Sequence, residues 1–167
     1  MIMYRERIIR AFRYQLNEIV QNFLAARDRR DEDAIHDMRV ALKRMRALFR
    51  LLHAVSPPFD EKKRFKRFKK LSRATSRLRD LHVQAGLAGK TGEETDIDVN
   101  PYISYLERES DHEWEAFSVF TGDDPLRKLS RSQKRIRDAL QGISEEEASA
   151  RSRELYCVMR DEFIRLG

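Results

Sequence analysis

Residues that interrupt helices or cross-link a chain are scarce in this sequence. Its 167 residues include six glycines, four prolines and one cysteine, Cys157. A single cysteine excludes an internal disulfide, and so few glycines and prolines favour long regular elements joined by short loops. The sequence also lacks an apolar run of membrane-spanning length and a recognisable signal peptide. We therefore expect one cytoplasmic domain that is long enough to bury a core.

Positive charge is concentrated in one part of the chain. The segment 36–80 holds 15 Lys or Arg against four acidic residues, a net charge of +11. Because the whole chain carries +6, the remaining residues together carry −5. This asymmetry predicts a polyanionic partner, such as a nucleic acid, an anionic membrane surface or a phosphate polymer.

Apolar residues recur at helical spacing along almost the whole chain, and alternating strand patterns are absent. The predicted fold class is therefore all-α: an antiparallel bundle of about six long helices joined by short connections. We expect the helices at about 2–27, 31–55 and 59–85, from Asn100, from Asp124, and from Ser144 to the C-terminus. Prolines after residue 55 close the second helix, and the Gly-rich segment 86–98 is expected to be the one sizeable loop.

Five basic side chains recur in steps of three and four along the segment 34–52, AIHDMRVALKRMRALFRLL: His36, Arg39, Lys43, Arg46 and Arg50. At 100° per residue they fall within an arc of roughly 80°. The main apolar stripe of the helix lies on one side of this basic ladder, and Val40, Ala47 and Leu51 lie on the other. A solvated face would lie opposite the core. The phase of the ladder therefore predicts the lining of a groove.

From Met38 onward, the helix that carries the basic ladder has no acidic residue. No Asp or Glu occurs between Met38 and Phe59, so i,i+4 ion pairs cannot neutralise it. Like charges at that spacing cost roughly 0.2 to 0.5 kcal/mol per pair. Two explanations remain open at this point: carboxylates from other helices neutralise the groove, or an anionic ligand does.

The helix expected at 59–85 carries a second row of basic residues. One side holds Lys62, Lys66, Lys69, Lys70, Arg73 and Arg77, and roughly the opposite side holds Phe65, Phe68, Thr75 and Leu78. This is ordinary amphipathic geometry, so we expect both phenylalanines in the core. The basic side is either a solvated face or the second wall of the groove.

Two segments carry a resemblance to a known family. IHDMRVALKRMRALFRLL resembles the signature helix of the CHAD family, the conserved-histidine α-helical domain. TSRLRDLHV, residues 75–83, is similar to the second signature, which Arg79, Asp80 and Val83 match, whereas Ser76 and His82 stand where Gly and Asp are usual. The resemblance implies a helical domain of two four-helix halves, with a basic central surface that binds inorganic polyphosphate.

A weaker copy of the ladder is predicted near the C-terminus. A shift of 114 residues lays 145–166 over 31–52 with seven identities, but Ala150 replaces the histidine and Cys157 replaces Lys43. We therefore expect a single CHAD-like domain, 1–167, with a four-helix half at 1–120 and an incomplete second half at 121–167. Helices left without partners favour a homodimer.

The predicted function is binding of inorganic polyphosphate in a groove between the second and third helices. The predicted contacts are His36, Arg39, Lys43, Arg46, Arg50, Lys66, Lys69, Lys70, Arg73, Arg77, Arg153 and Arg160. Arg offers a planar fork for phosphate and Lys a mobile point charge. The alternative is non-specific binding of nucleic acid or an anionic surface, although the second helix has no Asn or Gln beside its cations to read base edges.

Catalysis has no strong candidate, so we expect no enzyme, cofactor or metal. The segment GLAGKTG ends like a phosphate-binding loop, but it lacks the first glycine and the preceding strand. Glu109 with His112, and Asp33 with His36, have the spacing of half-sites in di-metal helical bundles. Such a bundle needs further inward carboxylates, so a di-metal enzyme is the most distant alternative.

Overall fold

The computed structural model describes residues 4–95, 97–121, 132–141 and 143–154. The helices are α1 (Tyr4–Arg29), α2 (Glu32–Val55), α3 (Glu61–Ala74), α4 (Ser76–Glu94), α5 (Asn100–Thr121) and α7 (Ser132–Leu140), and residues 145–154 are also helical. No residue in these described ranges belongs to a strand. The prediction of an all-α helical bundle is confirmed.

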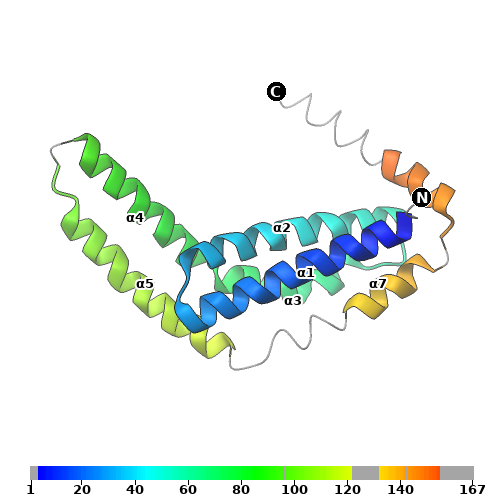
Figure 1. The fold of residues 1–167 in the computed structure, drawn as a ribbon, viewed down its shortest axis with the longest axis horizontal. Helices are drawn as coiled ribbons and strands as arrows, with labels where there is room; N and C mark the ends of the chain where they lie inside the picture. The colour runs from blue at the N-terminus through cyan, green and yellow to red at the C-terminus, as the bar shows by residue number, and fades with distance from the viewer. Residues whose placement is uncertain (1–3, 96, 122–131, 142, 155–167) are drawn as a thin grey trace.

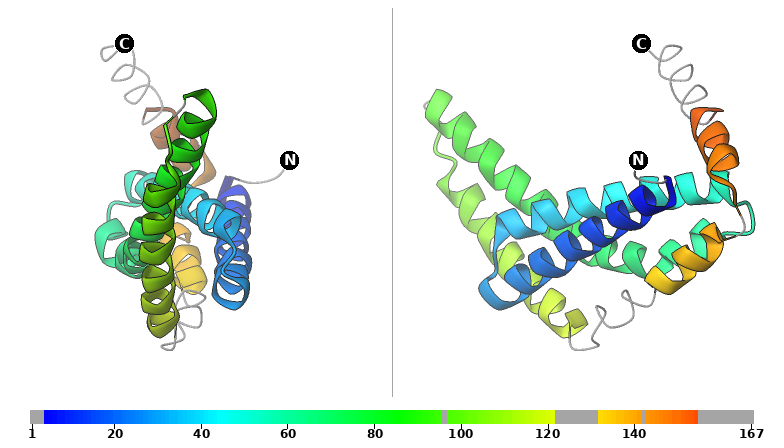
Figure 2. Two further views of the ribbon diagram at one scale, coloured as in Figure 1. Left: turned by 90° about the vertical axis from the view of Figure 1, so that its left-hand side faces the viewer. Right: turned by 45° about the vertical axis from the view of Figure 1, so that its right-hand side comes forward.

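The helices form a body with an arm at one end. In the body, α1 and α2 are an antiparallel pair, α3 runs back beside α2, and α7 packs on α1 (Figure 1). The arm is the α4–α5 hairpin, which projects away from the body, while segment 145–154 lies at the opposite end (Figure 2). None of the described helices is both long enough and apolar enough to cross a membrane.

A cluster of aromatic rings centred on Phe49 holds α3 against the α1–α2 pair. The ring of Phe49 lies 6.2 Å from that of Phe12 and 5.5 to 5.9 Å from those of Phe59, Phe65 and Phe68. Edge-to-face aromatic pairs of this kind add to the gain from burying the rings. Phe68 is buried and Phe65 packs against the core, so the predicted position of both rings is confirmed.

The predicted third helix and the loop after it are wrong. The helix kinks at Thr75, and α4 continues through the supposed loop as far as Glu94. The Thr75 hydroxyl donates to the carbonyl oxygens of Leu71 and Ser72, and such side-chain bonds to the backbone bend helices. Gly92 allows close packing between the two helices of the arm, because a Cβ at this position would collide with Val99.

Side chains at Asp31 and Ser144 cap two of the helices at the starts expected from the sequence. The Asp31 side chain accepts a hydrogen bond from the Ala34 N–H at 2.9 Å, which opens α2. The Ser144 hydroxyl likewise accepts from the Glu147 N–H at 3.1 Å, at the helix start expected there. The helix start predicted at Asp124 lies outside the described residues.

Candidate polyanion-binding site

Two contacts turn the basic ladder of α2 toward α3. Arg39 donates through Nη1 to the Ser72 carbonyl oxygen at 2.9 Å and to the Ser76 hydroxyl at 3.1 Å. Two turns along α2, the Arg46 guanidinium lies 5.9 Å from the centre of the Phe65 ring, within cation–π range. The ladder therefore borders the junction with α3, as its phase predicted.

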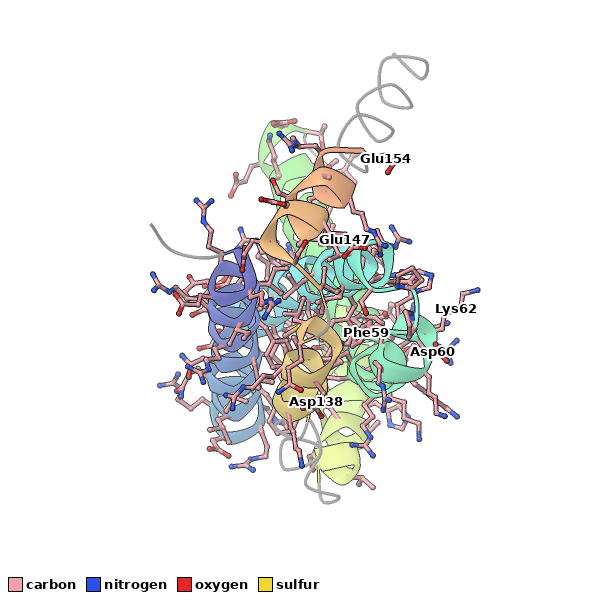
Figure 3. The ribbon with its side chains drawn as sticks, turned by 90° about the vertical axis from the view of Figure 1, so that its right-hand side faces the viewer. Phe59, Asp60, Lys62, Asp138, Glu147 and Glu154 are labelled. Carbon is pink, nitrogen blue, oxygen red and sulfur yellow. The ribbon has the colours of Figure 1, made fainter. Side chains whose placement is uncertain are left out.

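Arg46 lies in a hollow between α2 and α3. This basic pocket has a volume of about 230 Å³ and is lined by Arg46, Phe49, Glu61, Lys62, Phe65 and Lys69. Three cations from two helices thus surround an aromatic floor, with one carboxylate at the rim. Lys62 projects outward from the start of α3 in Figure 3. Such an arrangement can hold an anion by charge while the rings exclude water from one side.

The basic ladder has no carboxylate partner within the described part of the chain. His36, Lys43, Arg46 and Arg50 are exposed and form none of the ion pairs found there. Glu61 lines the basic pocket without pairing to any of its cations. Of the two explanations left open by the sequence, neutralisation by other helices is therefore not seen among these residues.

Arg39 differs from the other members of the ladder because it is half-buried and already bonded. Its two acceptors belong to the residues that flank the Thr75 kink, and the Ser76 hydroxyl itself donates to the Ser72 carbonyl oxygen at 2.9 Å. Ser76 stands where the family signature usually has Gly. Its hydroxyl gives Arg39 an acceptor that glycine could not supply.

The basic row predicted on one long helix is divided by the kink. Lys66, Lys69 and Lys70 are all exposed, but only Lys69 lines the basic pocket. Arg73, also exposed, lies one turn after Lys69. Arg77 belongs to α4 and pairs with Glu109 of α5 at 3.5 Å. Only part of this row therefore borders the groove.

Of the two cations predicted near the C-terminus, only Arg153 is described, and it does not line the basic pocket. Arg153 is exposed on segment 145–154, and Arg160 lies outside the described residues. Arg151 of the same segment donates to the Val55 carbonyl oxygen at 2.7 Å, which places the segment at the C-terminal end of α2. Figure 3 shows Glu147 and Glu154 on this segment.

Lys62 was missing from the predicted set of contacts, although it lies in the pocket. The available signal was its spacing of seven residues from Lys69, which places both on one flank of α3. In the sequence this flank is only part of a broad basic side of the helix. The sequence does not show which edge of that side meets α2.

His82 was also missed, and it lies in a second pocket where α2, α4 and α5 meet. Its Nε2 lies 3.4 Å from Glu32 Oε1 at the start of α2 and 3.4 Å from the Ser110 hydroxyl of α5. Burial lowers the pKa of His82, the nearby Glu32 carboxylate acts in the opposite direction, and Arg79 adds to the lowering. A neutral, buried imidazole thus joins three helices where the family signature usually has Asp.

Residues 10–156 match the family model described as CHAD domain. The chain belongs to the CHAD domain family. No curated protein and no solved structure matches this CHAD domain. Within its described ranges, no three residues of the metal-binding types come together as a possible ion site.

Proposed function

We propose that this CHAD domain binds inorganic polyphosphate along the groove between α2 and α3. The family as a whole binds polyphosphate. The observation that supports the proposal is the basic pocket, in which Arg46, Lys62 and Lys69 surround an apolar floor. A bound polyanion would supply the counter-charge that the described carboxylates do not.

The proposed contacts divide into two groups. Arg46, Lys62 and Lys69 hold one stretch of the chain in the basic pocket, and Lys43 and Arg50 extend the contact along α2. Ladder residues are about 5 Å apart along the helix axis, so consecutive side chains can follow a flexible polymer with closely spaced charges. We assign Arg39 the separate task of holding the groove walls together, because its guanidinium is engaged by Ser72 and Ser76. The proposed role is binding without catalysis.

Single-stranded nucleic acid remains the second candidate, and the aromatic side chains argue against it. Sequence-tolerant binding of bases uses exposed aromatic rings as stacking platforms. Phe68 is buried, and Phe65 is half-buried with Arg46 over its ring. The groove therefore offers charge to a backbone but no fully exposed ring to a base.

Affinity measurements across a salt series test the proposal. Polyphosphate of defined length, single-stranded DNA and heparin are compared for the native protein and for Lys43→Gln/Arg46→Gln/Lys69→Gln. If each lost contact is worth about 1 kcal/mol, polyphosphate affinity falls about 100-fold. The salt dependence of binding should fall as well, because fewer phosphates are neutralised.

A matched control removes the same charge elsewhere. Arg7→Gln/Arg10→Gln/Lys134→Gln changes three exposed cations of α1 and α7 and should leave the affinity within about threefold. Comparable affinity for all three polyanions, unchanged in the groove variant, would rule out the proposed function.

A further inference from the structure

The second pocket lies where the arm joins the body (Figure 1). Its volume of about 360 Å³ exceeds that of the basic pocket and falls within the usual range of small-molecule sites, about 300 to 1,000 Å³. Its buried side consists of Leu81, His82, Leu106 and Trp114. The second pocket and the basic pocket share no lining residue, so they are separate sites.

The charge of the second pocket is opposite to that of the basic pocket. Glu32, Glu107 and Asp111 contribute three carboxylates and Arg30 one guanidinium, a net charge of −2 while the buried His82 is neutral. Arg30 Nη1 lies 2.8 Å from Asp111 Oδ1, which neutralises that one carboxylate. The ion pairs found in the described ranges leave Glu107 without a cation and give Glu32 only the neutral imidazole. The second pocket therefore attracts cations and repels anions.

The imidazole of His82 has hydrogen-bonding capacity that the described residues do not fill. Its side chain is 4% exposed and lines the second pocket. Nε2 lies 3.4 Å from both the Glu32 carboxylate and the Ser110 hydroxyl, which is long for a hydrogen bond, and the buried Nδ1 has no partner in the described part of the chain. Incomplete bonding of a buried polar group is uncommon and points to a further group that binds beside it.

The aromatic wall of the second pocket suits a cation. Trp114 is 6% exposed, and its ring centre lies 6.1 Å from that of His82. Tryptophan is the aromatic side chain that attracts cations most strongly. The neighbouring side chains of Leu81 and Leu106 offer apolar surface to a carbon chain. A metal ion fits these surroundings poorly, because no three metal-binding side chains converge within the described ranges.

We propose that the second pocket binds a small organic cation whose ammonium groups are carried on a short aliphatic chain. Ammonium groups donate to the carboxylates of Glu32 and Glu107, and the aliphatic chain lies against Trp114. Two ammonium groups match the net charge of the second pocket, so a diamine is the class of ligand that it fits best. This inference does not depend on polyphosphate binding.

Fluorescence of Trp114 tests the proposal, because it is the one tryptophan of the chain and lines the second pocket. The full chain is titrated at constant ionic strength with the diamine putrescine up to about 10 mM, which detects even a millimolar dissociation constant. Putrescine should change the emission in a saturable way, whereas succinate, a dicarboxylate with the same number of carbons, should not. An emission that putrescine leaves unchanged would overturn the proposal, as would an equal response to succinate or to MgCl₂.

Charge variants test whether the carboxylates of the second pocket hold the ligand. Glu107→Gln should weaken putrescine binding about five- to tenfold, because it removes an exposed carboxylate that no described cation pairs with. Glu115→Gln is the matched control: this exposed residue of α5 lies two turns further on and outside the second pocket, and its loss should change the affinity less than about twofold. Equal affinities in the native protein and Glu107→Gln, or equal losses in both variants, would show adventitious attraction to an acidic surface and overturn the proposal.

Arg30→Gln carries the opposite expectation. Loss of the guanidinium frees the Asp111 carboxylate, so putrescine should bind at least about twofold more tightly. Weaker or unchanged binding in this variant would contradict a site for cations.

Discussion

Among the basic side chains of α2, Arg39 is the one that donates hydrogen bonds to two residues near the Thr75 kink. Its guanidinium spans from α2 to the residues on both sides of the Thr75 kink. A planar fork can serve two acceptors at once, whereas an ammonium is a point charge on a flexible stem. The geometry of this one residue therefore matters as much as its charge.

Arg39→Lys should lower the free energy of unfolding by about 1 to 2 kcal/mol, because the charge is kept but the paired hydrogen bonds are lost. Urea denaturation followed by circular dichroism measures the change. Lys43→Gln, one turn along the same ladder and exposed, is the control and should stay within about 0.5 kcal/mol of the native value. Equal effects of the two substitutions would contradict a structural role for Arg39.

His82 makes stability depend on pH. Burial lowers its pKa from the usual value of 6.5, so the folded chain takes up a proton less readily than the unfolded chain does. Its contribution is complete above that value and is lost as the pH falls below 6.5 toward the lower pKa of the folded state.

Unfolding free energies measured from about pH 5 to about pH 8 should therefore fall more steeply on the acid side for the native protein than for His82→Gln. The other three histidines are common to both proteins, so the difference reports on His82 alone. Parallel pH profiles for the two proteins would show that the imidazole titrates alike in the folded and unfolded chains.

At the scale of the helices, α2 could be predicted almost to the residue, and α3 and α4 could not. The start of α2 is set by Asp31 and its end by the prolines that follow, and both signals are local. The kink at Thr75 also depends on Arg39, which is distant in the sequence and reaches it only in the folded chain. The glycines of α4 led to the wrong prediction of a loop for a similar reason. Gly92 is needed because it packs closely against Val99, a contact that exists only in the folded chain.

The candidate site, like the helices, could be predicted only in part from the sequence. The phase of the basic ladder on α2 follows from sequence alone, because helix geometry fixes it. Which residues of α3 would meet the ladder depends on how the two helices pack, and that packing selected Lys62 and Lys69 over Lys66 and Lys70. The position of His82, beside Glu32 and Ser110, depends on three helices at once.

Phe49 is the residue on which the packing of α3 depends most. Phe49→Ala should cost about 3 to 5 kcal/mol, because the ring is buried and contacts four other rings. Chemical denaturation measures the loss, with Tyr14→Ala as an exposed control that should change little. A loss below about 1 kcal/mol would mean that α3 is held to the body by other contacts.

At the scale of the whole molecule, the cations of the groove lower the stability of the folded protein until an anion binds. The uncompensated ladder repels itself, and salt screens that repulsion. Raising NaCl from about 50 to about 500 mM should therefore increase the melting temperature of the free protein while weakening its binding to polyphosphate.

Polyphosphate present at about 100 times its dissociation constant should stabilise the native protein by about 2.7 kcal/mol, or roughly 5 to 10 °C in melting temperature. At the same polyphosphate concentration, Lys43→Gln/Arg46→Gln/Lys69→Gln should show little of this increase. An equal increase in both proteins would place the bound polymer outside the groove. Scanning calorimetry measures all of these temperatures.

The kink at Thr75 makes the arm a lever. Its helix α4 has 19 residues, a length of about 28 Å, so a change of about 10° in the bend would carry the far end through about 5 Å. The side chain that braces this hinge, Arg39, belongs to the wall of the groove. A substitution that removes the hydrogen bonds of Arg39 would therefore be amplified into a displacement at the tip of the arm.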